Sequence, residues 1–189
     1  MAIPNRNSNN ILGLVNQLLQ EQLPIEYADV NVFPSHDVKG PEVTAISISD
    51  QSQAPYLKIW LCNQLQQELA CKPSQVKMIH VSSTERLAQE VACGTVYENS
   101  VIRVNDFQGC ETYVGVVFLG MDNNYSQLLE MCSRAQYKLI LVISRENLLL
   151  GEIRSTQTEI TVLDIEDLET TQRRQHRPGS FLTKQCNVF

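Results

Sequence analysis

Tyr113–Gly120, with the sequence YVGVVFLG, and Tyr137–Ser144, with the sequence YKLILVIS, decide the fold class. Both stretches are almost entirely apolar and contain several β-branched residues, which favours strands. Strands that are apolar on both faces belong to the middle of a parallel sheet, where helices cover both sides. The chain is therefore expected to form a layered α/β domain.

Around these two runs, the spacing of apolar residues predicts an alternation of helices and further strands. Helices are predicted over 8–23, 55–69, 83–92 and 126–135, and strands over 43–49, 76–82, 100–104 and 159–165. Ser8 or Asn9 is available to cap the first helix. Alternation of this kind predicts a parallel sheet of about five or six strands with helices on its faces.

The composition describes an ordinary globular chain of 189 residues, with 43% hydrophobic residues and a formal net charge of −6. A chain of this length buries a sizeable core without disulfides or metals. Its six cysteines show no CxxC spacing and lie mostly in apolar stretches, which favours reduced thiols. Neither a signal peptide nor an apolar run of about 18 residues is present, so we expect an intracellular protein, cytoplasmic or nuclear.

Two segments are expected along the chain. Residues 1–165 form the α/β domain, and residues 166–189 form a short helix followed by a basic, disordered tail without periodicity. His36, His80 and His176 show no metal-ligand spacing, so we expect no metal site.

A phosphate loop is missing from the sequence. The GxxxxG spacing at Gly115 and Gly120 is followed by Met121 and Asp122, where Lys and Ser or Thr are needed, and the residues between the two glycines are a strand core. There is no GxGxxG spacing, and no acidic pair ends an early strand. The sequence therefore predicts no complete ATP site.

Three segments occur in an informative order. Asn5-Arg6-Asn7-Ser8 precedes a helix, Asp106-Phe107-Gln108-Gly109-Cys110-Glu111 precedes a strand, and Ser133-Arg134-Ala135 ends a helix before the next strand. Together they resemble motifs IV, V and VI in the second RecA-like motor domain of superfamily 1 helicases, over residues 3–144. The resemblance implies a three-layer RecA-like fold of the P-loop NTPase type, here without its phosphate loop.

In that family ATP lies between two RecA-like domains, and the resemblance implies a role for each matching residue. Arg6 and Arg134 match arginines that reach the γ-phosphate from the second domain, a role that suits a planar, permanently charged guanidinium. Glu111 matches an acid on the nucleotide side of the cleft. Phe107, Gln108 and Gly109 match the loop beside the bound nucleic-acid strand, where glycine allows a tight backbone path.

The chain departs from the family pattern. Asn5 replaces the usual Tyr, Asn105-Asp106 stands where Asp-Ser is common, and Ser133 replaces Thr. The first motor domain, which supplies the phosphate loop and the Mg²⁺ ligand, is absent. We therefore expect a motor half that has no ATPase activity alone, remodels DNA or RNA only with a first RecA-like domain, and binds nucleic acid weakly because the chain is acidic. The alternative is a non-catalytic interaction or regulatory module derived from a helicase domain.

Each of these residues also has a structural interpretation. Arg6 can be a solvated residue, Arg134 can complement the dipole of the helix that it ends, and Glu111 and Gln108 can cap a turn. Cys186-Asn187-Val188-Phe189 has the C-a-a-X form of a prenylation signal, with basic residues upstream that would strengthen a membrane contact. The alternative is a basic tail without lipid.

Overall fold

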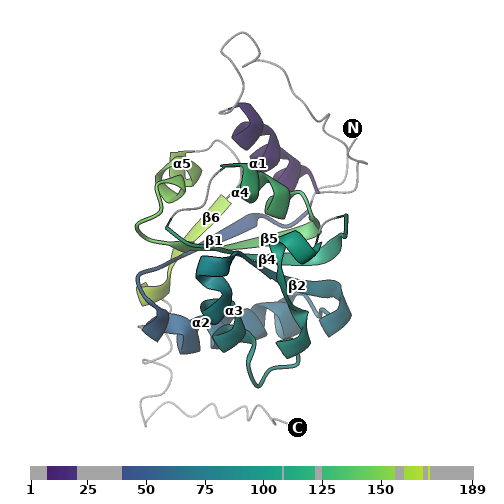
Figure 1. The fold of residues 1–189 in the computed structure, drawn as a ribbon, viewed down its shortest axis with the longest axis vertical. Coiled ribbons are helices and arrows are strands. Elements are labelled where there is room, and N and C mark those ends of the chain that lie inside the picture. Colours follow the sequence, from purple (N-terminus) through teal and green to yellow (C-terminus); the bar gives the residue numbers. More distant parts are fainter. Residues whose placement is uncertain are drawn as a thin grey trace.

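Six parallel strands form one sheet in the computed structural model, which describes residues 8–20, 40–107, 109–121, 125–155, 160–167 and 170 (Figure 1). The order of the strands across the sheet is β3-β2-β4-β5-β1-β6. Their bounds are β1 Val43–Ile48, β2 Val76–His80, β3 Val101–Arg103, β4 Thr112–Leu119, β5 Ala135–Ser144 and β6 Ile160–Asp164. All pairings between neighbours are parallel, which confirms the predicted α/β class and sheet.

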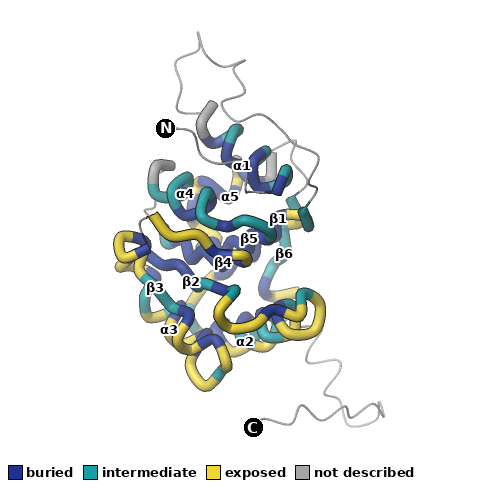
Figure 2. The backbone as a smooth tube through the Cα atoms, turned by 90° about the vertical axis from the view of Figure 1, so that its right-hand side faces the viewer, coloured by how far each residue is buried: buried dark blue, intermediate teal, exposed yellow. Residues whose placement is uncertain are grey.

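The two apolar runs of the sequence are the two central strands. Val116 of β4 lies opposite Ile140 of β5, and both side chains are fully buried. Figure 2 shows these strands almost entirely buried between the helices. Gly115 lies inside β4, where an added Cβ would come within 2.9 Å of the Ala135 Cβ. This glycine therefore serves close packing between strands, in agreement with the conclusion that it is no part of a phosphate loop.

Helices cover both faces of the sheet, which makes three layers (Figure 1). One face packs against α1 (Asn9–Gln20), α4 (Tyr125–Cys132) and α5 (Leu149–Ser155). The other face packs against α2 (Ala54–Asn63), which continues as a π-helical turn, and α3 (Glu85–Ala92). Successive residues of each strand contribute to opposite cores, because side chains alternate along a strand.

Two of the differences between the observed and the predicted elements have a clear local cause. α4 ends at Cys132 and not at residue 135, because Ala135 already belongs to β5, where it lies opposite Thr112. α5 was not predicted. Its start is held by Asn147, whose Oδ1 accepts a hydrogen bond of 2.9 Å from the Leu149 N–H.

The end of the chain is described only in part. β6 confirms the strand predicted over 159–165, and residues 165–167 are helical where the short helix was expected to begin. Residues 171–189, with the predicted tail and Cys186, lie outside the described residues. Within the described ranges, no helix is both long enough and apolar enough to cross a membrane.

Candidate functional site at the amino ends of β4 and β5

The amino ends of β4 and β5 bring two of the three sequence motifs together. The Thr112 N–H at the start of β4 donates to the carbonyl oxygen of Arg134, at a distance of 2.9 Å. The Gln136 side chain donates to Glu111 Oε2 at 2.6 Å. Because neighbouring parallel strands begin at the same edge of a sheet, residues from two distant segments become neighbours there.

The beginning of α1 joins the same edge. The Ser8 N–H donates to the carbonyl oxygen of Gln136 at 2.7 Å, and the Asn10 side chain donates to the carbonyl oxygen of Gly40 at 3.0 Å. A Cβ at Gly40 would come within 2.2 Å of the Ser8 Cβ, so this close approach requires glycine. Arg6 lies outside the described residues, two positions before Ser8. Its role stays a prediction.

Arg134 occupies the turn between α4 and β5. Its Nη2 lies 3.7 Å from Glu130 Oε1, and 27% of its side chain is exposed. A partly exposed pair at this distance holds a side chain weakly. The guanidinium is therefore free to leave Glu130 for a stronger anion. The position just beyond the carboxyl end of α4 also suits the helix dipole, so both interpretations of Arg134 fit its surroundings.

The loop before β4 requires glycine at one position. Gly109 has a φ of +76°, in the left-handed region, and apart from its chain neighbours no described heavy atom lies within 4 Å of the position that a Cβ would take. The positive φ favours glycine at this position, whereas the space around it would admit a side chain. The exposed Glu111 follows, with its carboxylate bound by the Gln136 side chain. Gln108 lies outside the described residues.

Phe107 does not fit the role expected for it. The residue is only 3% exposed and belongs to the apolar core beneath α1 and α4. A buried ring cannot stack on a nucleobase unless the core opens, which costs several kcal/mol for an aromatic residue of this size. The resemblance placed Phe107 in the loop beside a bound strand, but in this structure its ring anchors that loop to the core and is not available to stack on a base.

Two other features at this edge have no signal in the sequence pattern. The rings of Tyr113 and Tyr137 stack with their centroids 4.7 Å apart, and Tyr113 is 38% exposed. Lys138 is only 6% exposed and donates to the Glu42 carbonyl oxygen and, at 2.7 Å, to Thr44 Oγ1. Burial lowers the pKa of the Lys138 amine to about 8. Both features depend on pairings between strands that periodicity alone does not predict.

Two described pockets lie elsewhere in the molecule. One of about 280 Å³ lies at the carboxyl ends of β1, β4 and β5, and one of about 690 Å³ lies beside β3. The described part of the chain has no cluster of three or more His, Cys, Asp or Glu side chains arranged to hold a metal ion.

Comparison with known proteins supports the fold. None of the protein-family models matches the sequence, and no curated protein matches it. Among solved structures, the C-terminal domain of a possible DNA helicase from Lactobacillus plantarum WCFS1 is similar, with a TM-score of 0.55 and 14% sequence identity. The similarity covers 83% of this chain and 97% of that one. The chain thus has a six-stranded, all-parallel α/β fold that resembles a helicase C-terminal domain.

Proposed function

We propose that this chain is the second motor half of a superfamily 1-type helicase and contributes Arg134, Glu111 and Arg6 to an ATP site completed by another domain. The observation that carries the proposal is the meeting of three separate segments at one edge of the sheet. Hydrogen bonds join the start of β4 to Arg134, and join Gln136 both to Glu111 and to the start of α1. Three short motifs that resembled the family only by chance would not be expected to meet at one edge of the sheet.

The chemistry of this edge suits a shared phosphate site. Among the described residues, the Arg134 guanidinium is held by a 3.7 Å ion pair alone, so it can turn to the charge that develops on a transferred phosphoryl group. The phosphate loop and the Mg²⁺ ligands would come from the first RecA-like domain. ATP is then a substrate of the pair of domains, and this chain alone hydrolyses none.

Reconstitution with a first motor domain tests this proposal. The purified chain is mixed with the isolated phosphate-loop domain of a superfamily 1 helicase, and ATP turnover is measured with and without single-stranded nucleic acid. We expect stimulation by the unmodified chain and a loss of at least about 100-fold with Arg134→Ala, since an arginine in this role contributes about 10³-fold or more. Arg145→Ala, which removes an exposed arginine after the carboxyl end of β5, is the matched control.

Three results would contradict the proposal. One is ATP turnover by the isolated chain that Arg134→Ala abolishes. Another is equal stimulation by the unmodified chain and Arg134→Ala. A large loss of thermal stability in Arg134→Ala, measured by circular dichroism, would show that the residue is structural. If no first domain responds to the chain at all, the chain is the non-catalytic interaction module.

Binding to nucleic acid is proposed to be weak in the isolated chain. A net charge of −6 provides little of the phosphate neutralisation on which non-specific affinity depends. We expect a Kd on the order of 10⁻⁴ M or weaker at physiological salt. Fluorescence anisotropy with single-stranded DNA and RNA across a salt series measures it. A submicromolar Kd would show that the chain binds a strand without a first domain.

A further inference from the structure

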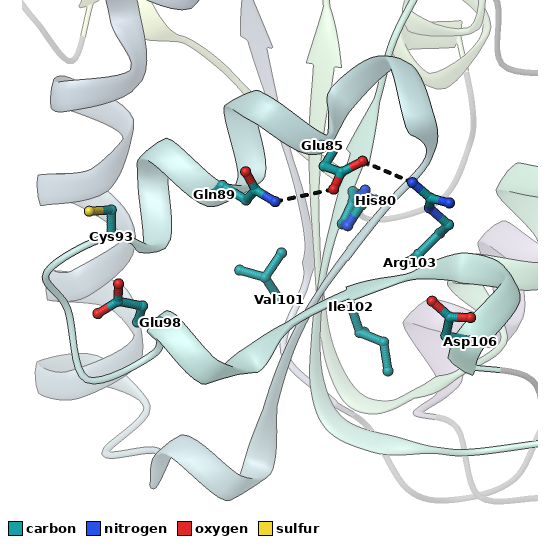
Figure 3. Close-up of a pocket in the computed structure, with 9 residues that line it drawn as sticks. All are labelled: His80, Glu85, Gln89, Cys93, Glu98, Val101, Ile102, Arg103 and Asp106. Atoms are coloured by element: carbon teal, nitrogen blue, oxygen red, sulfur yellow. Dashed lines mark hydrogen bonds and ion pairs between the residues drawn. The ribbon is translucent and has the colours of Figure 1, made fainter.

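A pocket of about 690 Å³ lies between α3 and β3, the strand at one edge of the sheet (Figure 3). This volume is in the range that holds ligands in proteins, about 300–1,000 Å³. The lining residues come from β2, α3, β3 and the turns on either side of β3. Asp106 also begins the motif V segment, but neither Glu111 nor Arg134 lines the pocket, so the pocket needs an interpretation of its own.

The charges around the pocket are mostly negative. Glu85, Glu98 and Asp106 contribute three carboxylates, against one guanidinium from Arg103. Arg103 Nη2 lies 2.9 Å from Glu85 Oε2, so that cation already has a partner. Within the described residues, Glu98 and Asp106 form no ion pair. Figure 3 shows these two side chains toward opposite ends of the pocket.

Two further side chains of the pocket, His80 and Gln89, offer hydrogen-bond acceptors. His80 is only 4% exposed, and its Nδ1 lies 3.0 Å from the carbonyl oxygen of Val81. Because a carbonyl oxygen only accepts, Nδ1 carries the hydrogen in this contact, and Nε2 accepts a hydrogen bond whenever it carries no hydrogen of its own. No described residue bonds to Nε2. Gln89 Nε2 donates to Glu85 Oε1 at 3.2 Å, which leaves the Gln89 oxygen as a further acceptor.

We propose that this pocket binds the guanidinium or ammonium groups of a basic peptide segment. Such groups carry several donors and no acceptor, which complements a pocket with unpaired carboxylates and a buried imidazole acceptor. Two carboxylates at opposite ends suit two cationic side chains of one extended segment. β3 pairs with β2 alone among the described strands, and no described strand covers its outer edge, where the backbone of such a segment could pair.

The test uses a fluorescein-labelled peptide with the sequence of residues 171–182, which contains three arginines and no acidic residue. Its anisotropy is measured at physiological ionic strength with the unmodified chain and with Glu98→Gln/Asp106→Asn. We expect saturable binding that the double variant weakens about fivefold, the loss expected from two exposed ion pairs. Glu68→Gln/Glu146→Gln is the control, since it removes two exposed acids that do not line the pocket. Equal weakening by both variants, or none by the first, overturns the proposal.

Alkylation gives a separate test of location. Cys93 is exposed and lines the pocket, whereas Cys110 is exposed and does not line it. Bound peptide is expected to slow the reaction of Cys93 with N-ethylmaleimide, followed by mass spectrometry, and to leave Cys110 unchanged. Equal protection of both thiols, or protection of neither at saturating peptide, contradicts binding in this pocket.

One further variant identifies the source of the peptide. The chain carries the same basic sequence, so Arg173, Arg174 and Arg177 are replaced by Gln in the full chain. Tighter binding of the added peptide by this variant shows that the chain's own segment occupies the pocket, whereas unchanged binding shows that the pocket is open to another protein. Both results support a site for basic peptides. A peptide with every arginine replaced by Gln should not bind, and equal binding by it refutes the proposal.

Discussion

Lys138 gives the sharpest prediction about the free energy of unfolding. Burial lowers the pKa of its amine to about 8 from the ordinary value of 10.5, although Glu42 and Glu68 act in the opposite direction. The folded chain therefore binds fewer protons than the unfolded chain between these two pKa values. Stability contributed by this group rises as the pH increases through that window and falls as the pH decreases toward 8.

The magnitude follows from the two pKa values. For a pKa of about 8 in the folded chain and about 10.5 in the unfolded chain, linkage predicts that this amine adds about 2 kcal/mol to the free energy of unfolding between pH 7 and pH 9.5. Lys138→Met removes this dependence. The hydrogen bonds lost to Glu42 and Thr44 change the stability of the variant by an amount that does not depend on this titration.

Urea unfolding at pH 7 and pH 9.5, followed by circular dichroism in the presence of a reductant, measures the difference. The unmodified chain should gain about 2 kcal/mol relative to Lys138→Met at the higher pH. Other groups cancel in this comparison; Tyr97, whose pKa burial raises to about 12, is present in both chains. Lys72→Met, which removes an exposed amine, controls for the loss of one charge. A constant difference, or one of opposite sign, would show that Lys138 is not desolvated as described.

Two further predictions concern glycines. Gly115→Ala should lower the free energy of unfolding by about 1–3 kcal/mol, because its Cβ would come within 2.9 Å of the Ala135 Cβ, and adding Ala135→Gly should recover part of that loss in a double-mutant cycle by urea unfolding. If the two losses simply add, the close contact is not the cause. Gly109→Ala should cost about 1 kcal/mol because of its φ of +76°, and Gly109→Asn less, since Asn tolerates this conformation. Equal stability of all three forms in the same assay would show that the loop does not require a left-handed residue.

The predictions from sequence succeeded where the signal is local. Six strands were found where apolar runs or alternation predicted them, and the unbroken runs became the central strands. α5 was missed because its seven residues carry too short a periodic pattern. The end of α4 was placed too late because Ala135 suits a helix by intrinsic preference, whereas pairing with β4 puts it in a strand.

In the candidate site, too, the features with a local sequence signal were predicted and those that depend on distant contacts were not. The motif order predicted that Glu111 and Arg134 act together, and the structure brings their segments to one edge of the sheet. The burial of Phe107 could not be predicted from its motif, because an aromatic residue in a polar loop has the same local sequence whether its ring faces solvent or the core. Its exposure depends on α1 and α4, which lie far from it along the chain.

The α/β class, the helices and strands with clear periodicity, and the lack of a phosphate loop can be read from the linear sequence, because each depends on residue types within a few turns or one strand. Four other features emerge from the folded chain alone: the strand order, the convergence of α1, Glu111 and Arg134, the buried amine of Lys138 and the acidic pocket around His80. These features depend on which distant segments touch. Contacts between distant segments determine which side chains are buried, which charges are neighbours and which hydrogen bonds form. A linear pattern of residue types does not specify those contacts.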